Sequence, residues 1–207
     1  MATIDELTTN IINDLAKETE EGITAAVSSA ISQSINYYES QPWWFQETQD
    51  TITTVDGTEY YDLPSDIAST EITITIEVSN NTYPLIKRHF QLIEDWFVKS
   101  NIFTGYPTDY ALWKQQIRLY PVPNGAYTVT RNYYQKLGVP SAGASNSWTT
   151  DAETLIQSRA EWLLYSLRYH DLEAATVTKT VEQDSYKDML GQNDLRLMVG
   201  RTRKRRV

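Results

Sequence analysis

The sequence predicts an α+β fold, in which N- and C-terminal helices form a helical bundle and an antiparallel β-module is inserted between them. Apolar residues recur every three or four positions before residue 39 and again after residue 149, as on one face of a helix. From residue 50 the period becomes two, as in a half-buried strand. An exposed apolar helix face needs a partner, and the other helical segment is the most economical one. The expected parts are the N-terminal helices (1–46), the β-module with one short helix (47–146), the C-terminal helices (147–200) and a basic C-terminal arm (201–207).

The first segment is expected to form two helices. Gly22 follows the acidic stretch ETEE and interrupts the periodic pattern, and glycine inside a helix costs about 1 kcal/mol relative to alanine. We therefore expect a break near residues 20–23. Pro42 ends the second helix, because the residue before a proline is pushed out of helical geometry. The apolar faces of the two helices consist of Ile4, Leu7, Ile11, Leu15, Ile23, Ala26, Val27, Ala30, Ile31, Ile35 and Tyr38.

Three aromatic residues follow this proline. Trp43, Trp44 and Phe45 point in different directions in any regular backbone, so one flat core face cannot hold all three. We expect them at the corner between the bundle and the β-module, or at a subunit contact. Such a corner can direct one ring into each core and one toward a neighbouring molecule. At least two of the three side chains are expected to be mostly buried within the chain.

The β-module is predicted to begin with a hairpin. The stretches DTITTV and TEYYDLP flank Asp56-Gly57, a two-residue turn in which both positions favour positive φ. Residues 71–78 alternate Ile and Val against Glu and Thr, as expected of a strand with one wet face. The next turn is expected at Asn80-Asn81, followed by a returning strand.

The rest of the β-module is expected to hold one helix and three strands. An amphipathic helix spans 87–99, with Phe90, Ile93, Trp96 and Phe97 on its apolar side. The expected strands lie within 109–114, 116–121 and 126–137, and residues 138–147 have the composition of a loop.

Helix is expected to return near residue 150. Thr149 or Thr150 can cap it, and Asp151 and Glu153 favour the positive end of its dipole. A break near Asp171-Leu172 separates it from a final helix. Helical spacing relates Leu155, Ile156, Trp162, Leu163, Leu167 and His170 in the first of these helices, and Val181, Tyr186, Met189, Leu190 and Leu197 in the second.

Charge is unevenly distributed along the chain. Residues 1–86 hold fifteen acidic residues and one basic residue, a net charge of −14, while residues 87–200 are neutral and the whole chain carries −9. An acidic half and a basic end suggest head-to-tail contact between copies, or an arm reserved for another partner. The five positive charges of this arm are Arg201, Arg203, Lys204, Arg205 and Arg206.

Several classes of protein do not fit the sequence. Without cysteine there is no disulfide framework and no thiolate metal site. No apolar run approaches the roughly 20 residues that cross a bilayer, and the N-terminus does not resemble a secretory signal. Nucleophile-elbow, phosphate-loop and zinc-protease motifs are missing, and His89 and His170 lack partners at ligand spacing. We therefore expect no enzyme, no cofactor and no metal.

Two other binding functions are alternatives. A basic-tailed virion protein would bind DNA through phosphate contacts that are blind to sequence and sensitive to salt. A carbohydrate-binding β-sandwich would use some of the six Trp and fourteen Tyr residues. The pairs Tyr60/Tyr61 and Tyr133/Tyr134 lie in predicted strands, where one member of each pair faces outward whatever the function, so structural use is the better default.

Two blocks of the sequence form recognisable motifs, T-x-x-G-T-x-x-Y-x-L-P and G-x-P-x-x-Y-A-L…I-R-L-Y-P. They consist of Thr54, Gly57, Thr58, Tyr61, Leu63 and Pro64, and of Gly105, Pro107, Tyr110 to Leu112 and Ile117 to Pro121. Through these blocks, and in order from about residue 25 to residue 195, the chain resembles the head-to-tail adaptor (connector) proteins of tailed bacteriophages.

The resemblance implies a non-enzymatic ring in the neck of the virion, between head and tail. Such a ring, expected to be a dodecamer, binds the portal protein above and a tail or nozzle protein below. It extends the DNA channel, helps to retain the packaged genome and contacts passing DNA without sequence specificity. Before joining the virion the protein would be in the host cytoplasm. The C-terminal segment of the family reaches the portal, so the basic arm is expected to contact either the portal or DNA.

Overall fold

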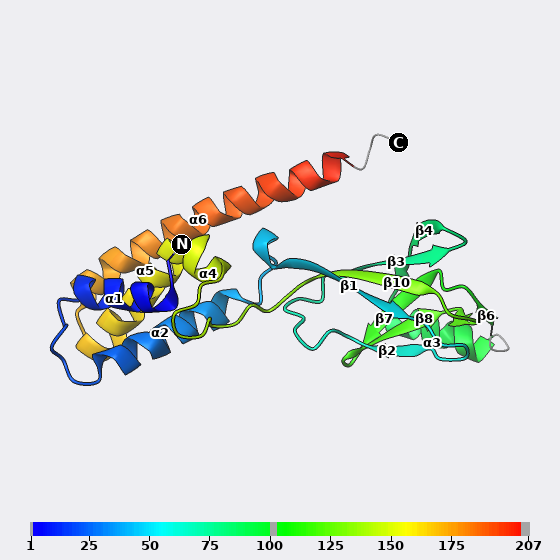
Figure 1. Ribbon diagram of the computed structural model, residues 1–207, viewed down its shortest axis with the longest axis horizontal. Helices are drawn as coiled ribbons and strands as arrows, with labels where there is room; N and C mark the ends of the chain where they lie inside the picture. The colour runs from blue at the N-terminus through cyan, green and yellow to red at the C-terminus, as the bar shows by residue number, and fades with distance from the viewer. Residues whose placement is uncertain (1, 100–102, 204–207) are drawn as a thin grey trace. The chain divides into compact units, whose positions relative to one another are not determined.

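The computed structural model describes residues 2–99 and 103–203 of the chain. These residues form two compact units, one made of Met1–Phe45 and Lys136–Val207 and the other of Gln46–Gln135 (Figure 1). We refer to them as the helical unit and the β unit. The predicted α+β class is confirmed, since helices from both ends of the chain form one unit and the strands of the middle form the other.

The N-terminal part of the helical unit contains α1 (Ile4–Asp14) and α2 (Ile23–Tyr38). Thr3 begins α1 with a capping box, because its Oγ1 accepts from the Glu6 N–H while its own N–H donates to the Glu6 carboxylate. The predicted break is confirmed: Gly22 has a φ of 77°, a left-handed conformation that suits glycine. α2 ends at Tyr38, ahead of Pro42.

The C-terminal part contains α4 (Ser147–Thr150), α5 (Glu153–Leu163), a π-helix (Leu164–Tyr169) and α6 (Leu172–Arg203). The cap predicted at Thr149 or Thr150 is wrong. Asn146 caps α4 instead, because its Oδ1 accepts from the Trp148 N–H at 3.0 Å. The predicted break near residue 171 is confirmed, since His170 has a φ of 55° just before α6 begins.

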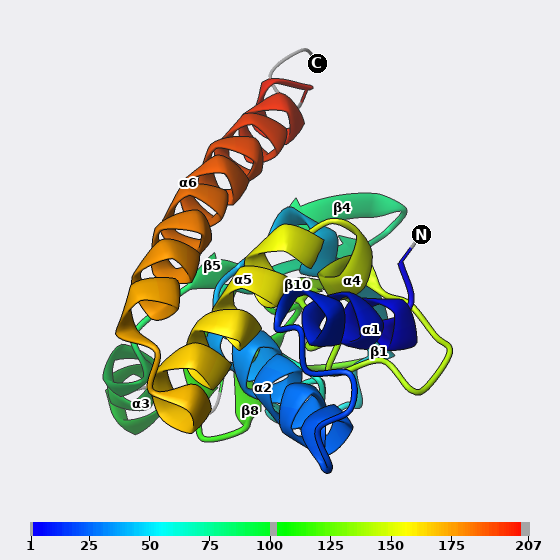
Figure 2. The same cartoon turned by 90° about the vertical axis from the view of Figure 1, so that its left-hand side faces the viewer.

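The core of the helical unit lies between α1, α2, α5 and α6 (Figure 2). Its buried side chains come from both ends of the chain, so the two helical segments share one core. The buried residues are Ile4, Leu7, Ile11, Leu15, Ile23, Val27, Ala30, Ile31, Ile35, Tyr38, Trp43, Trp148, Ala152, Leu155, Ile156, Ala160, Leu164 and Met189.

The loop from residue 136 to 146, which we expected in the β-module, belongs to the helical unit. Its backbone is tied to α1 and α2. The Gly138 N–H donates to Glu39 Oε1 at 2.6 Å, and the Ile4 N–H donates to the Ala144 carbonyl at 3.0 Å. The Gly143 N–H donates to the Asp5 carboxylate. The composition of this segment predicts a loop, but it does not predict which of the two units the loop packs against.

The buried face of α6 differs from the expected one. Of the predicted apolar residues, Met189 is buried and Tyr186 half-buried, but Val181 and Leu190 are exposed. The side chain of Leu197 lies outside the described residues. Among the side chains of α6 that the structure describes, up to Arg196, the buried ones are Ala175, Glu182, Met189 and Asn193. The polar members of this set turn inward because they find hydrogen-bond partners there.

Within its described residues, the β unit contains two four-stranded sheets, a two-stranded parallel pair of β6 and β9, and one helix. The first sheet has the order β1-β10-β3-β4 and is antiparallel throughout. The second has the order β2-β8-β7-β5, with a parallel pair at β5 and β7. The strands of the β unit are β1 (Glu47–Thr53), β2 (Tyr60–Asp62), β3 (Thr73–Val78), β4 (Asn81–Pro84), β5 (Ile86–Lys87), β6 (Thr104–Gly105), β7 (Asp109–Trp113), β8 (Gln116–Tyr120), β9 (Val122–Pro123) and β10 (Thr128–Tyr134).

The core of the β unit contains side chains from both four-stranded sheets, together with the predicted face of β3. It consists of Ile72, Ile74, Ile76, Leu85, Tyr110, Ile117, Leu119, Val129 and Tyr133. The predicted helix is α3 (Phe90–Lys99), whose Ile93 is fully buried. Arg118 of β8 lies under α3, paired with Glu94 and 4.1 Å from the centre of the Phe97 ring.

The predicted hairpin at Asp56-Gly57 is wrong. A turn does form there, because Gly57 has a φ of 75° and the Thr58 N–H donates to the Val55 carbonyl. The strands on its two sides enter different sheets, however: β1 pairs with β10, and β2 pairs with β8. The β3–β4 hairpin is present, but its turn is at Ser79-Asn80, one residue earlier than expected, with positive φ at both positions.

Candidate interaction site

The aromatic segment after Pro42 is part of the helical core. Trp43 is 1% exposed, its indole N–H donates to the Tyr38 carbonyl at 3.0 Å, and its ring is nearly parallel to that of Phe45. Phe45 also meets Trp148 edge to face. Trp44 and Phe45 are half-buried. All three aromatic residues pack in the helical unit and, in the described part of the chain, none belongs to the core of the β unit, so the expected division between two cores is wrong.

α6 holds this segment through one side chain. Asn193 Oδ1 accepts from the Trp44 N–H at 2.9 Å, and Asn193 Nδ2 donates to the Pro42 carbonyl at 3.0 Å. The Arg196 guanidinium lies 4.5 Å from the centre of the Trp44 ring. The amide thus acts as a clip that satisfies two backbone groups of a segment without regular structure. One face of Trp44 is covered by Arg196.

A second polar contact anchors the middle of α6. Glu182 is 3% exposed and accepts hydrogen bonds from the Tyr38 hydroxyl at 2.5 Å, Arg159 Nη1 at 2.7 Å and Lys179 Nζ at 2.5 Å. These donors come from α2, α5 and α6. The Arg159 guanidinium also lies 3.5 Å from the centre of the Tyr37 ring. One carboxylate therefore links three helices of the unit.

The environment of this carboxylate determines its protonation. Burial alone would raise the pKa of Glu182, but the hydrogen bonds from Lys179, Tyr38 and Arg159 hold that pKa below its usual value. Burial, followed by the bond to Glu182, raises the pKa of the Tyr38 hydroxyl. At neutral pH the cluster is thus an ionised carboxylate with a neutral phenol and two cations, a structural arrangement rather than an acid–base pair poised to react.

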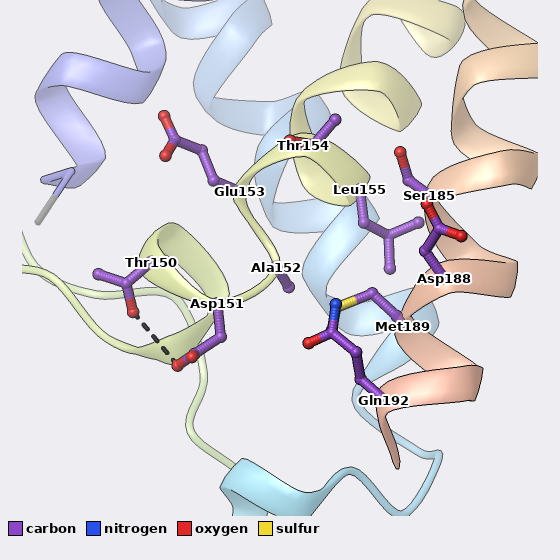
Figure 3. A pocket seen from close by; sticks show the side chains of 10 residues that line it. All are labelled: Thr150, Asp151, Ala152, Glu153, Thr154, Leu155, Ser185, Asp188, Met189 and Gln192. Atoms are coloured by element: carbon purple, nitrogen blue, oxygen red, sulfur yellow. Dashed lines mark hydrogen bonds between the residues drawn. The ribbon is translucent and has the colours of Figure 1, made fainter. Parts of the chain in front are cut away.

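A groove of about 290 Å³ lies between the start of α5 and the middle of α6 (Figure 3). Ala152, Leu155 and Met189 form its apolar floor. Asp151 and Asp188 stand at its rim, and no Lys or Arg side chain is among its lining residues. Ser185 and Gln192 add to the polar part of its lining.

The predicted basic arm begins inside α6. The helix extends to Arg203, so Arg201 and Arg203 lie in its last turns. Lys204, Arg205 and Arg206 lie outside the described residues, as do the side chains of Arg201 and Arg203. Since α6 reaches so far, the start of the basic segment is carried on a helix that is anchored at Glu182 and Asn193.

Within the described ranges 2–99 and 103–203, no group of three or more His, Asp or Glu residues has the arrangement of a metal site. His89 and His170 are both exposed. None of the helices in those ranges is sufficiently long and apolar to span a membrane.

Comparison with protein families assigns the chain. The model of the SU10 adaptor protein family matches residues 2–206, almost the whole length. The chain belongs to this family. The SU10 adaptor family consists of phage head-to-tail adaptor proteins, so this protein is a structural component of a virion, at the junction of head and tail. No curated protein matches the sequence.

The sequence of this SU10 adaptor indicates the aromatic segment after Pro42, but it does not indicate the polar residues that anchor α6 to this segment and to the bundle. Glu182, Arg159 and Asn193 are polar residues within helical patterns, where solvent exposure is the usual expectation. One signal was present: Ala175, Glu182 and Met189 follow each other at intervals of seven residues, the spacing of one helix face.

Proposed function

We propose that the protein forms a ring under the portal, extends the DNA channel, helps to retain the packaged genome and provides the platform to which tail proteins attach. Membership of the SU10 adaptor family over residues 2–206 is the observation that carries this proposal. The proposed partners are the portal protein above, a tail or nozzle protein below, and further copies of the chain, with a dodecamer expected. The chain would be in the host cytoplasm during assembly.

The charge distribution supports a channel function. The first 86 residues carry a net charge of −14. Like charges repel phosphates, so an acidic wall lets DNA pass without gripping it. Passing DNA is accordingly a transient neighbour and not a sequence-specific ligand.

We further propose that the basic arm (Arg201, Arg203, Lys204, Arg205 and Arg206) contacts the portal. α6 is anchored in the bundle and extends to Arg203, so the basic segment begins on a helix that is held in place, and its charges suit an acidic surface on a second protein. DNA contact by the arm is the other possibility, and it predicts a steep dependence on salt. Trp44 and Phe45, which are half-buried, are proposed to complete a contact with a neighbouring subunit.

Electron microscopy of the purified protein mixed with its portal tests the proposal. A ring on the portal is the expected result, and its absence would refute the ring function. Deleting residues 201–207 should weaken portal binding while circular dichroism shows an unchanged fold. A gel shift with duplex DNA that disappears on the same deletion would assign the arm to DNA instead.

A further inference from the structure

The outer edge of β1 has no partner in the described part of the chain. β1 is the edge strand of its sheet. Along an edge strand, the backbone N–H and C=O groups of successive residues point alternately toward the neighbouring strand and away from it. The Thr54 N–H donates to the Tyr127 carbonyl, and the Gln46 carbonyl accepts from the Gln135 N–H, so the even-numbered residues bond to β10. The N–H and C=O groups of the odd-numbered residues therefore point outward. They belong to Glu47, Gln49, Thr51 and Thr53.

This edge has little of the usual protection against pairing. Exposed edges are commonly blocked by Pro, by charged side chains, by a bulge or by being very short. The charged residues of β1 are Glu47 and Asp50, and Asp50 is paired with Arg131 within the sheet. β1 has seven residues, no Pro, no Lys and an uninterrupted register with β10. By contrast, β2 has three residues, and the two-residue strand β5 ends in Lys87. β1 is thus the long, open edge of the β unit.

The opposite edge of the same sheet has a complementary arrangement. The Leu85 N–H donates to the Ile74 carbonyl, so in the same register the backbone N–H and C=O of Tyr83 face β3. The backbone groups of the alternate residues, Thr82 and Pro84, therefore point away from the sheet. The side chain of Tyr83 is 48% exposed although it shares a face with buried Ile76. A row of side chains, Ile52–Val129–Ile76–Tyr83, crosses the sheet and ends at two incompletely covered residues.

We propose that β1 of one copy pairs with β4 of the next copy, so that the sheet continues from subunit to subunit. The inference rests on the proposed ring. The sheet has four antiparallel strands, so a repeated β1 placed beside β4 is again antiparallel to it. Two different edges meet in this contact, which makes it heterologous, the kind that closes a ring.

The face pattern fixes the register. Placing Thr53 opposite Thr82 puts Ile52 opposite Tyr83 on the apolar face, and Thr51 opposite Pro84 on the polar face. Thr53 and Thr82 then exchange two hydrogen bonds, and the Thr51 N–H donates to the Pro84 carbonyl. Proline has no N–H, so a fourth bond is missing. Such a contact is weak by itself and gains strength in a closed ring, where each copy is held from both sides.

Residue-resolved amide hydrogen exchange of the isolated protein and of the assembled ring on its portal tests this register. The amides of Thr51, Thr53 and Thr82 should exchange at least about tenfold more slowly in the ring. Gln49, which has no partner in this register, should keep its rate and serves as an internal control. Rings that form while Thr51 and Thr53 exchange as in the isolated protein would refute the pairing but leave the proposed function intact. Failure to form any ring would refute both.

A pair of variants separates backbone pairing from side-chain effects. Thr51→Pro removes an N–H that the fold itself does not use, whereas Thr51→Ala keeps it. Thr51→Pro should reduce the fraction of protein in rings and Thr51→Ala should not. Tyr83→Lys, at an exposed position, should reduce it as well by charging the facing edge. Equal ring formation by all three variants, each with an unchanged circular dichroism spectrum, would overturn the inference.

Discussion

Replacing Glu182 by Ala should destabilise the helical unit by about 3–5 kcal/mol, the usual cost of breaking a buried ion pair. The substitution leaves three donors without their acceptor. Arg159 and Tyr38 are both buried, and each buried donor left unsatisfied costs about 1–3 kcal/mol. Lys179 is about one third exposed and can turn to water, so it adds little.

Urea unfolding followed by far-UV circular dichroism measures this loss. With an m-value of about 2 kcal/mol/M, the midpoint should fall by roughly 2 M. Asp194→Ala is the matched control, because Asp194 is an exposed carboxylate on the same helix, and its midpoint should correspond to a change within about 0.5 kcal/mol. A loss below about 1 kcal/mol for Glu182→Ala would refute the view that this carboxylate anchors α6.

The pH dependence gives a second check. The pKa of Glu182 is lower in the folded chain than its ordinary value, so its contribution is present above the ordinary pKa and is lost as pH falls through the folded one. The difference in unfolding free energy between wild type and Glu182→Ala should therefore shrink in acid. A difference that stays constant down to the acid transition would mean that the carboxylate is not ionised in the fold.

Three further substitutions test other contacts. Trp43→Ala should cost about 3–5 kcal/mol because the side chain is fully buried, whereas Trp113→Ala, at a 45% exposed position, should cost much less. Asn193→Ala should cost about 1–3 kcal/mol by leaving two backbone groups unpaired, and should raise the exchange rate of the Trp44 amide. Burial and the neighbouring Asp14 raise the pKa of Glu161 to about 6, so stability should decline as pH rises through 6, and Glu161→Gln should abolish that decline.

Each of these results has a contradicting outcome. A stable Trp43→Ala variant would place the ring outside the core, and an unchanged Trp44 amide in Asn193→Ala would exclude the clip. The raised pKa of Glu161 comes mainly from burial, and the Gln157 Nε2, which donates to Asp14 at 2.6 Å and to Glu161 at 2.9 Å, opposes it by lowering that pKa. A flat stability profile of the wild type across pH 6 would show that Glu161 is ionised there without cost.

Much of the fold follows from local signals in the sequence. Gly22 marks the break between α1 and α2 because only a left-handed residue fits there, and the alternating β3 is read directly from its isoleucines. The hairpin at Asp56-Gly57 failed because a turn signal specifies a local bend, not the sheet that the next strand joins. Pairing of β1 with β10 joins residues some eighty positions apart, which no short motif records.

The candidate site was harder to predict because its residues act through distant partners. Trp43 was recognisable as a buried aromatic, but the residue that clips its neighbour, Asn193, is about 150 positions away along the chain. Polar residues on the buried face of α6 weaken the apolar period, so the final helix reads as less amphipathic than its packing makes it. The arrangement becomes visible only when the donors Tyr38, Arg159 and Lys179 are assembled around Glu182.

These polar contacts fix the register of α6 more strictly than an apolar face would. If a helix slips along its axis by one turn, it moves by about 5.4 Å. In an apolar interface such a slip replaces one apolar contact by another similar one, so it costs little. In α6 the same slip would remove Glu182 from Arg159 and Asn193 from the backbone of Trp44, leaving a buried cation and two backbone groups unpaired. The basic segment begins eight residues after Asn193, about 12 Å further along the helix. Register errors would therefore shift the positive charges relative to the bundle, so the cost of burying polar groups in α6 is offset by a defined position for the segment proposed to reach the portal.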